Sequence, residues 1–157
     1  MSETIQVVSF KLGSEEYGVD IAQVQEINRM VAITHVPRAP QFMEGVINLR
    51  GQLIPIIDLR ARFGMPRTEH TKNTRIVVTE IGAKRVGMVV DSVSEVLRLP
   101  TDHIEDAPEM ITGVDTEYIR GVGKIEDRLI ILLDLARIIS GAEKRELEST
   151  DIEAVAV

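Results

Sequence analysis

The chain has 157 residues, about the size of one ordinary domain, and its 25 acidic and 18 basic residues give a net charge of −7. It contains no Cys, which excludes disulfide scaffolds, thiolate nucleophiles and Cys-ligated metal centres. The negative charge, with only two Tyr, three Phe and no Trp, argues against a surface for nucleic acid. No apolar run approaches the ~20 residues that cross a bilayer, and the acidic N-terminus resembles no secretory signal. We therefore expect a cytoplasmic protein with no nucleic-acid partner and no membrane insertion.

The first elements follow from turn residues and from the spacing of apolar residues. Residues 5–12 and 17–20 read as two strands joined by a turn at 13–16. Asp20 and Gln23 then resemble a capping box, and Ile21, Val24 and Ile27 lie three apart, so one or two helical turns are expected over 20–27. On that helix we expect Ile27 in the core and Val24 partly exposed.

The next stretch alternates extended segments with Pro and Gly. Residues 33–36 are extended, 37–40 are punctuated by two Pro, and 42–48 lead to a turn at 50–51. An apolar strand follows at 53–57, and Asp58 is placed to cap a short helix over 59–63. Gly64 and Pro66 end that helix.

The second half of the chain repeats the first. A shift of 69 residues places Gly18 on Gly87 and Glu26 on Glu95, and a shift of 76 places residues 53–59 on 129–135. The repeat ends on a longer C-terminal helix, predicted at 134–148 and capped by Asp134.

Each copy of about 65 residues holds five or so short strands, and the 19 Ile and 18 Val residues favour strands, so a small barrel is expected from each. The prediction is a mainly β, single-domain chain of two tandem five-stranded barrels, at 5–72 and 73–140. Whether the first strand stays in its own barrel is left open. Residues 1–72 are net neutral and 73–140 carry a net charge of −4, so the halves are candidates for contacting different partners.

No catalytic constellation is visible. The three His residues (35, 70 and 103) are scattered, and no phosphate-binding loop or serine nucleophile motif occurs. We expect no enzymatic activity, no metal and no cofactor. The turn of Asn48 and Arg50 stands out because the second copy has Lys124 and Glu126 there. It is either an Asn–Gly turn whose Arg hydrogen-bonds locally, or the site of a recognition Arg for a carboxylate or carbonyl of a partner.

At these residues the sequence resembles the CheW family of bacterial chemotaxis coupling proteins. The resemblance is carried by residues 16–27, by 45–51 (Gly-Val-Ile-Asn-Leu-Arg-Gly), by 55–59, and by 86–93 and 127–134 in the second half. It covers about residues 5–148. It implies two SH3-like barrels and a non-enzymatic adaptor that couples transmembrane chemoreceptors to the histidine kinase CheA in membrane-attached arrays.

The resemblance also implies two contact surfaces. A surface for the receptor's cytoplasmic tip falls on Val8, Ile21, Val24, Glu26, Gly45, Asn48, Arg50 and Val93. A surface for the kinase's regulatory domain falls on Ile33, Val36 and Pro37, with a second stretch at Pro108 and Met110. No obligate homo-oligomer is expected.

Two other functions stay open at this point. The chain could serve a different receptor and histidine kinase pathway with the same module. It could also be a small-ligand-binding barrel, although the sequence offers no set of convergent polar residues for a ligand.

Overall fold

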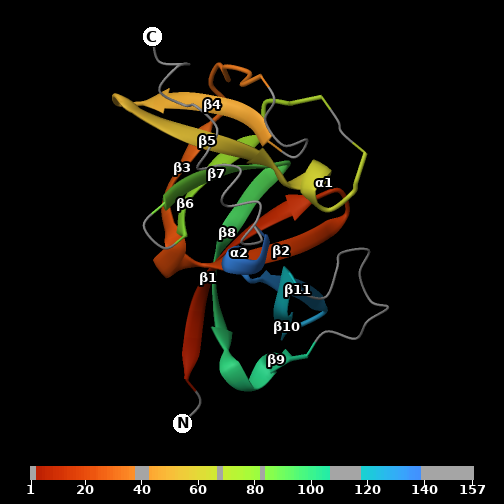
Figure 1. The fold of residues 1–157 in the computed structure, drawn as a ribbon. Coiled ribbons are helices and arrows are strands. Elements are labelled where there is room, and N and C mark those ends of the chain that lie inside the picture. Colours follow the sequence, from red (N-terminus) through yellow and green to blue (C-terminus); the bar gives the residue numbers. More distant parts are fainter. Residues whose placement is uncertain (1–2, 38–42, 67–68, 82–83, 107–117, 139–157) are drawn as a thin grey trace.

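The computed structural model describes residues 3–37, 43–66, 69–81, 84–106 and 118–138, which form two small β-barrels in contact (Figure 1). The elements in chain order are β1 (Thr4–Leu12), β2 (Glu15–Asp20), the 3-10 turn η1 (Ile21–Gln23), β3 (Val24–Arg29), β4 (Met43–Leu49), β5 (Gln52–Asp58), α1 (Leu59–Arg62), β6 (Arg75–Ile81), β7 (Lys84–Val90), β8 (Ser92–Pro100), η2 (Thr101–His103), β9 (Ile104–Glu105), β10 (Ile119–Ile125), β11 (Arg128–Leu133) and α2 (Leu135–Ile138).

The two barrels exchange hairpins. The upper barrel of Figure 1 has the strand order β3-β6-β7-β5-β4, and the lower barrel has the order β8-β1-β2-β11-β10-β9. The hairpin β1–β2 from the first half therefore completes the lower barrel, and β6–β7 from the second half completes the upper one. The predicted division into barrels at 5–72 and 73–140 is wrong in this respect. The physical reason is a parallel pairing of each hairpin with the other copy, β2 with β11 and β7 with β5.

The exchange is symmetric and agrees with the duplication. Ile56 pairs with Gly87 in the upper barrel, and Leu132 pairs with Gly18 in the lower one. Leu132 lies 76 residues after Ile56, and Gly87 lies 69 residues after Gly18, so the two pairings are related by the two shifts found in the sequence. At both places a side chain on the Gly would meet neighbours, because an added Cβ at Gly87 lies 2.5 Å from Ile56 Cδ1. Gly is thus the residue that lets the exchanged hairpin approach its partner strand.

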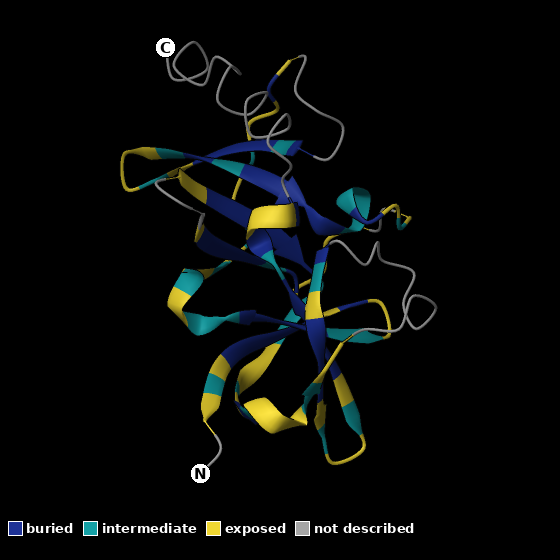
Figure 2. Ribbon diagram, turned by 60° about the horizontal axis from the view of Figure 1, so that its bottom comes forward, coloured by how far each residue is buried: buried dark blue, intermediate teal, exposed yellow. Residues whose placement is uncertain are grey.

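Strands such as β6 are buried on both faces, which explains why residues 76–78 are all apolar. Ile76 and Val78 pack inside the upper barrel, whereas Val77 joins a larger cluster that includes Phe10 and Tyr17 of the lower barrel. Alternating side chains of one strand therefore fill a barrel interior and the interface between barrels. Figure 2 shows this as buried strands near the centre and exposed turns at the periphery.

Some local expectations were wrong. The predicted helix over 20–27 is only the single turn η1, capped by Asp20, and the chain then continues as strand β3. Side chains alternate on a strand, so Ile27 is 40% exposed rather than part of the core, while Val24 is partly exposed, as expected. The helix after Asp58 ends at Arg62. Of the C-terminal helix predicted at 134–148, the structure describes Leu135–Ile138.

One carboxylate ties the barrels together where the chain crosses between them. Asp91 lies between β7 and β8 and accepts hydrogen bonds from Arg60 Nε at 2.8 Å and from the Gly13 backbone N–H at 2.8 Å. Arg60 belongs to α1 beside the upper barrel, and Gly13 to the β1–β2 turn. The Arg60 hydrogen bonds hold the pKa of Asp91 below its usual range, which burial alone would raise.

Gly18 and Gly87 give a matched test of the hairpin exchange. Gly87→Ala is expected to lower the free energy of unfolding by about 1–3 kcal/mol, because its neighbours Ile56 and Ile76 are fully buried and cannot move away. Gly18→Ala should cost less, because its nearest neighbour, Ile130 Cγ2, is 3.1 Å away. Urea unfolding of both variants measures the difference. An equal loss of unfolding free energy in the two variants would contradict this account of the hairpin exchange.

Asp91→Asn should show a pH-dependent loss of stability. A carboxylate with a depressed folded-state pKa stabilises the protein above its unfolded pKa, and that contribution is lost as the pH falls through the folded value. We expect Asp91→Asn to cost about 1–2 kcal/mol at neutral pH, discounted for partial exposure of the pair. The gap from wild type should shrink below the ordinary Asp pKa of 3.8. Urea unfolding at several pH values measures it, and a gap unchanged in acid would rule out the ion pair as its source.

Candidate functional site

The upper barrel carries an exposed ion pair at the tip of the β4–β5 hairpin. Arg50 Nη1 donates to Glu26 Oε1 at 3.3 Å, and Arg50 Nη2 also contacts Glu26 Oε2. Asn28 Nδ2 donates to Glu26 Oε1 at 2.9 Å and so fixes the carboxylate on β3. The Arg50 side chain is 69% exposed and that of Glu26 is 27% exposed. The pair therefore presents an oriented guanidinium to solvent.

The backbone of the turn positions Arg50. Arg50 and Gly51 have φ values of +52° and +86°, the left-handed region typical of a tight hairpin turn, and the Gly51 N–H donates to Asn48 Oδ1 at 2.8 Å. Asn48 is thus a turn residue, as the simple interpretation of the sequence held. Arg50 hydrogen-bonds within the chain, as that interpretation also held, but its partner Glu26 lies on β3 and not in the turn.

Electrostatics keep this pair ionised. The hydrogen bonds from Arg50 and then Asn28 lower the pKa of Glu26, and the hydrogen bond to Glu26 raises the pKa of Arg50. The carboxylate is therefore charged at neutral pH. A partner carboxylate or carbonyl can approach the exposed side of Arg50 without neutralising Glu26.

Apolar residues lie where the two barrels meet. Ile21, Val24 and Val93 are partly buried against the core cluster that the barrels share. Val8 belongs to that cluster and is 1% exposed, so it supports these residues from beneath and does not reach the surface. Val24 and Glu26 both belong to β3. The strand that carries the ion pair therefore also carries one of these apolar residues.

Gly45 has a structural role at the other end of β4. Its φ is +153°, and an added Cβ would lie 2.2 Å from the carbonyl oxygen of Thr34. Thr34 and Val46 exchange two backbone hydrogen bonds of 2.9 Å there. Gly45 thus lets the segment after β3 run against β4, because a side chain at this position would clash with Thr34.

That segment contains the residues assigned to the kinase. Ile33 is partly buried against the upper-barrel core, Pro37 is exposed, and Val36 is 3% exposed. Val36 is therefore a packing residue, and a direct contact from it is not supported. Val31, which the sequence interpretation missed, is 47% exposed in the same segment. Pro108 and Met110 lie outside the described residues.

Other residues around the ion pair were missed as well. Asn28 orients Glu26, and Arg85 on β7 adds a second positive charge near Glu26 while contacting Gln52. Asn28 follows Glu26 by two positions on the same strand, so alternation of a strand could have found it. Arg85 could not be found, because it reaches this face only through the exchanged hairpin.

The described residues hold no group of three or more His, Asp or Glu side chains arranged to bind a metal ion. In the same part of the chain, no helix has the length and apolar character needed to span a membrane. What the site offers is an oriented charge beside apolar side chains, which suits recognition of a protein surface.

Known proteins resemble this chain over nearly its whole length. The CheW-like domain model matches residues 6–143. The chemotaxis protein CheW of Klebsiella aerogenes is 43% identical over 134 residues, which are 85% of this chain and 81% of that protein. The probable chemotaxis protein CheW of Rhizobium etli is 37% identical over 138 residues, 88% and 89% of the two chains. The crystal structure of the scaffolding protein TtCheW from Thermoanaerobacter tengcongensis superposes with a TM-score of 0.82 at 38% identity, covering 91% of this chain and 92% of that one.

The fold therefore places this chain in the class of scaffold proteins built from two SH3-like barrels. The chain belongs to the CheW family, and its function is that of a chemotaxis adaptor.

Proposed function

We propose that this protein couples the cytoplasmic tip of transmembrane chemoreceptors to the regulatory domain of the histidine kinase CheA, without chemistry of its own. The Glu26–Arg50 pair on the upper barrel is the observation that carries this proposal. The receptor tip is a helical hairpin, and a helix can place apolar residues against Ile21, Val24 and Val93 while its acidic residues reach Arg50. The protein then acts in the cytoplasm, recruited to receptor arrays.

The kinase contact is proposed for the segment that follows β3. Val31 and Pro37 are exposed there, and Ile33 is half-buried between them. The Thr34–Val46 hydrogen bonds hold the segment to β4. This segment starts after β3, whereas Arg50 lies in the β4–β5 turn, so the two partners contact different loops of one barrel. The adaptor works by holding both partners at once.

Arg50→Glu tests the receptor surface. The substitution should weaken binding to a receptor cytoplasmic fragment by about tenfold, as expected for losing a charge-assisted contact and adding repulsion. Folding should be intact, because Glu126 occupies the equivalent turn position of the lower barrel with a φ of +53°. Isothermal titration calorimetry measures the affinity. Glu126→Arg is the matched control and should bind as wild type; wild-type affinity in Arg50→Glu would refute the surface.

Val31→Asp tests the kinase surface. It should weaken binding to the kinase regulatory domain by about tenfold, because it places a charge in an apolar contact. Receptor binding should be unchanged. Val96→Asp, at an equally exposed Val of the lower barrel, is the control. A pull-down on wild-type protein should recover receptor and kinase together, and loss of both partners in Val31→Asp would contradict two separate surfaces.

A further inference from the structure

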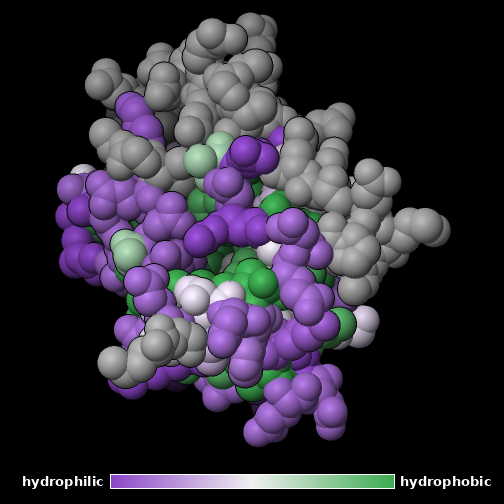
Figure 3. All heavy atoms as spheres, turned by 90° about the horizontal axis from the view of Figure 1, so that it is seen from below, coloured by the Kyte–Doolittle hydropathy of each residue, from purple (hydrophilic) through white to green (hydrophobic). Residues whose placement is uncertain are grey.

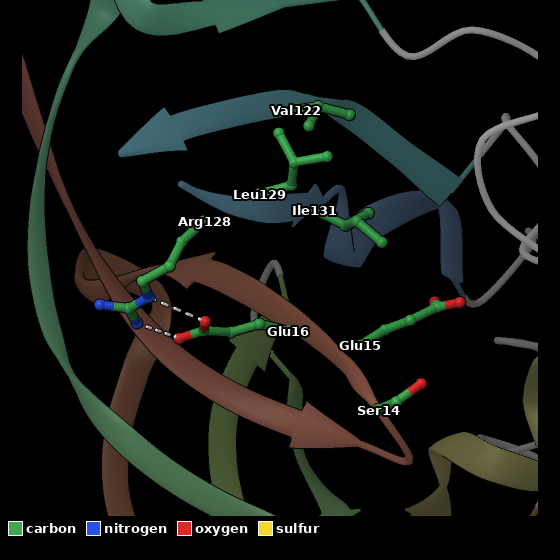
Figure 4. Close-up of a pocket in the computed structure, with 7 residues that line it drawn as sticks. All are labelled: Ser14, Glu15, Glu16, Val122, Arg128, Leu129 and Ile131. Atoms are coloured by element: carbon green, nitrogen blue, oxygen red, sulfur yellow. Dashed lines mark hydrogen bonds and ion pairs between the residues drawn. The ribbon is translucent and has the colours of Figure 1, made fainter. Parts of the chain in front are cut away.

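The lower barrel has a surface cleft that the proposed function does not use. It has a volume of about 310 Å³ and lies between β2 and the β10–β11 hairpin. Val122, Leu129 and Ile131 give it an apolar wall, and Ser14, Glu15 and Glu16 face that wall (Figure 4). Leu129 is 47% exposed, which leaves a large apolar side chain open to solvent at the cleft.

Arg128 in this cleft is paired with two carboxylates. Its Nε and Nη2 donate to Glu16 at 3.2 and 2.5 Å, and its Nη1 donates to Glu95 at 2.9 Å. Ser9 also donates to Glu16. Burial would raise the pKa of Glu16, but the hydrogen bonds from Arg128 and Ser9 outweigh it and lower that pKa. Glu16 is therefore charged, and Arg128 already directs its Nε, Nη1 and Nη2 donors at two carboxylates of the chain itself.

Glu15 is the carboxylate left to interact with a ligand. It accepts one hydrogen bond, from the Tyr17 hydroxyl at 2.7 Å, and forms no ion pair with another described residue. Glu126 and Asp127, in the turn before Arg128, are exposed and add two more negative charges. Lys11 opposes Glu16 across the strand pair and offsets one charge. The surroundings of the cleft are thus acidic on balance.

The equivalent place on the upper barrel has the opposite charge. The duplication puts Lys84 and Arg85 where the lower barrel has Glu15 and Glu16, and Gln52 where it has Arg128. Leu53 is equivalent to Leu129, so both places have an aliphatic residue. The backbone is shared between the barrels, whereas the charge of the rim is inverted. Figure 3 shows the lower barrel from below, with hydrophobic side chains visible between hydrophilic ones.

We propose that this cleft, formed by Ser14, Glu15, Glu16, Val122, Leu129 and Ile131, binds a basic and aliphatic segment of a partner protein. A Leu or similar side chain would lie against Leu129, and a neighbouring Lys or Arg would pair with Glu15. The charge of the rim and the engaged Arg128 argue for this occupant over an acidic one. The site lies on the other barrel from Arg50 and Val31, so it is independent of the proposed receptor and kinase contacts.

Titration with defined peptides tests the proposal on the full chain by ¹H–¹⁵N NMR. The probe is a capped six-residue peptide that alternates Lys and Leu, compared with one that alternates Glu and Leu. The Lys peptide should shift the amides of Ser14, Glu15, Glu16, Leu129 and Ile131, and its affinity should fall as salt rises from low to physiological. The Glu peptide should leave these amides unchanged.

Variants then assign the cleft. Leu129→Asp should weaken the Lys peptide by roughly tenfold, and Glu15→Gln by roughly threefold, since Gln keeps an acceptor for Tyr17 but loses the charge. Val96→Asp, an equally exposed Val outside the cleft, should bind as wild type. Unchanged affinity in Leu129→Asp, equal binding of the Glu peptide, or shifts centred on Lys84 and Arg85 would overturn the proposal. Dilution-dependent shifts at the cleft without peptide would also overturn it, because a second copy would then be the occupant.

Discussion

The parallel pairing of each hairpin with the other copy's barrel is the constraint on which the rest of the structure depends. β2 pairs with β11 and β7 pairs with β5, so neither barrel is complete without strands from both halves of the chain. Gly18 and Gly87 make room for these pairings, and the largest core cluster contains residues of both barrels. The four rings of Phe10, Tyr17, Phe63 and Tyr118 continue this contact, with successive centroids 5.9 Å apart. An adaptor gains from this arrangement a fixed geometry between its surfaces.

The duplicated barrels share backbone geometry at equivalent positions but differ there in the charge of their side chains. Arg50 and Glu126 occupy equivalent turns with φ of +52° and +53°, yet one is positive and the other negative. The same inversion separates Lys84 and Arg85 from Glu15 and Glu16. Because the turn geometry is kept, the contrast between these places comes from their side chains. The neutral first half and the acidic second half of the sequence show this contrast only in part. The exchanged hairpins carry their charged residues to the opposite barrel, so the charge of a sequence half is not the charge of a barrel.

Much of the fold follows from local signals in the sequence. Turn residues, Ile and Val runs and the repeat at 69 and 76 residues predict the strands and two barrels, because these signals depend on near neighbours. The exchange could not be predicted, since the pairing of β2 with β11 is set by contacts between distant segments. At the site, Asn48 and Gly51 signal a turn, but the pairing of Arg50 with Glu26 needs the three-dimensional fold. Ile27 was misplaced because an apolar spacing of three over so few residues fits a short turn followed by a strand as well as a helix.

Native-state hydrogen exchange tests the interlocked fold most directly. If the exchanged hairpins make the barrels one cooperative unit, amides in the β2–β11 and β5–β7 pairings should all exchange with the free energy of global unfolding. They should also respond together to a substitution such as Gly87→Ala in the upper barrel. Amides of the lower barrel that exchange at a distinctly lower free energy, unmoved by that substitution, would contradict the account, because the two barrels would then unfold independently.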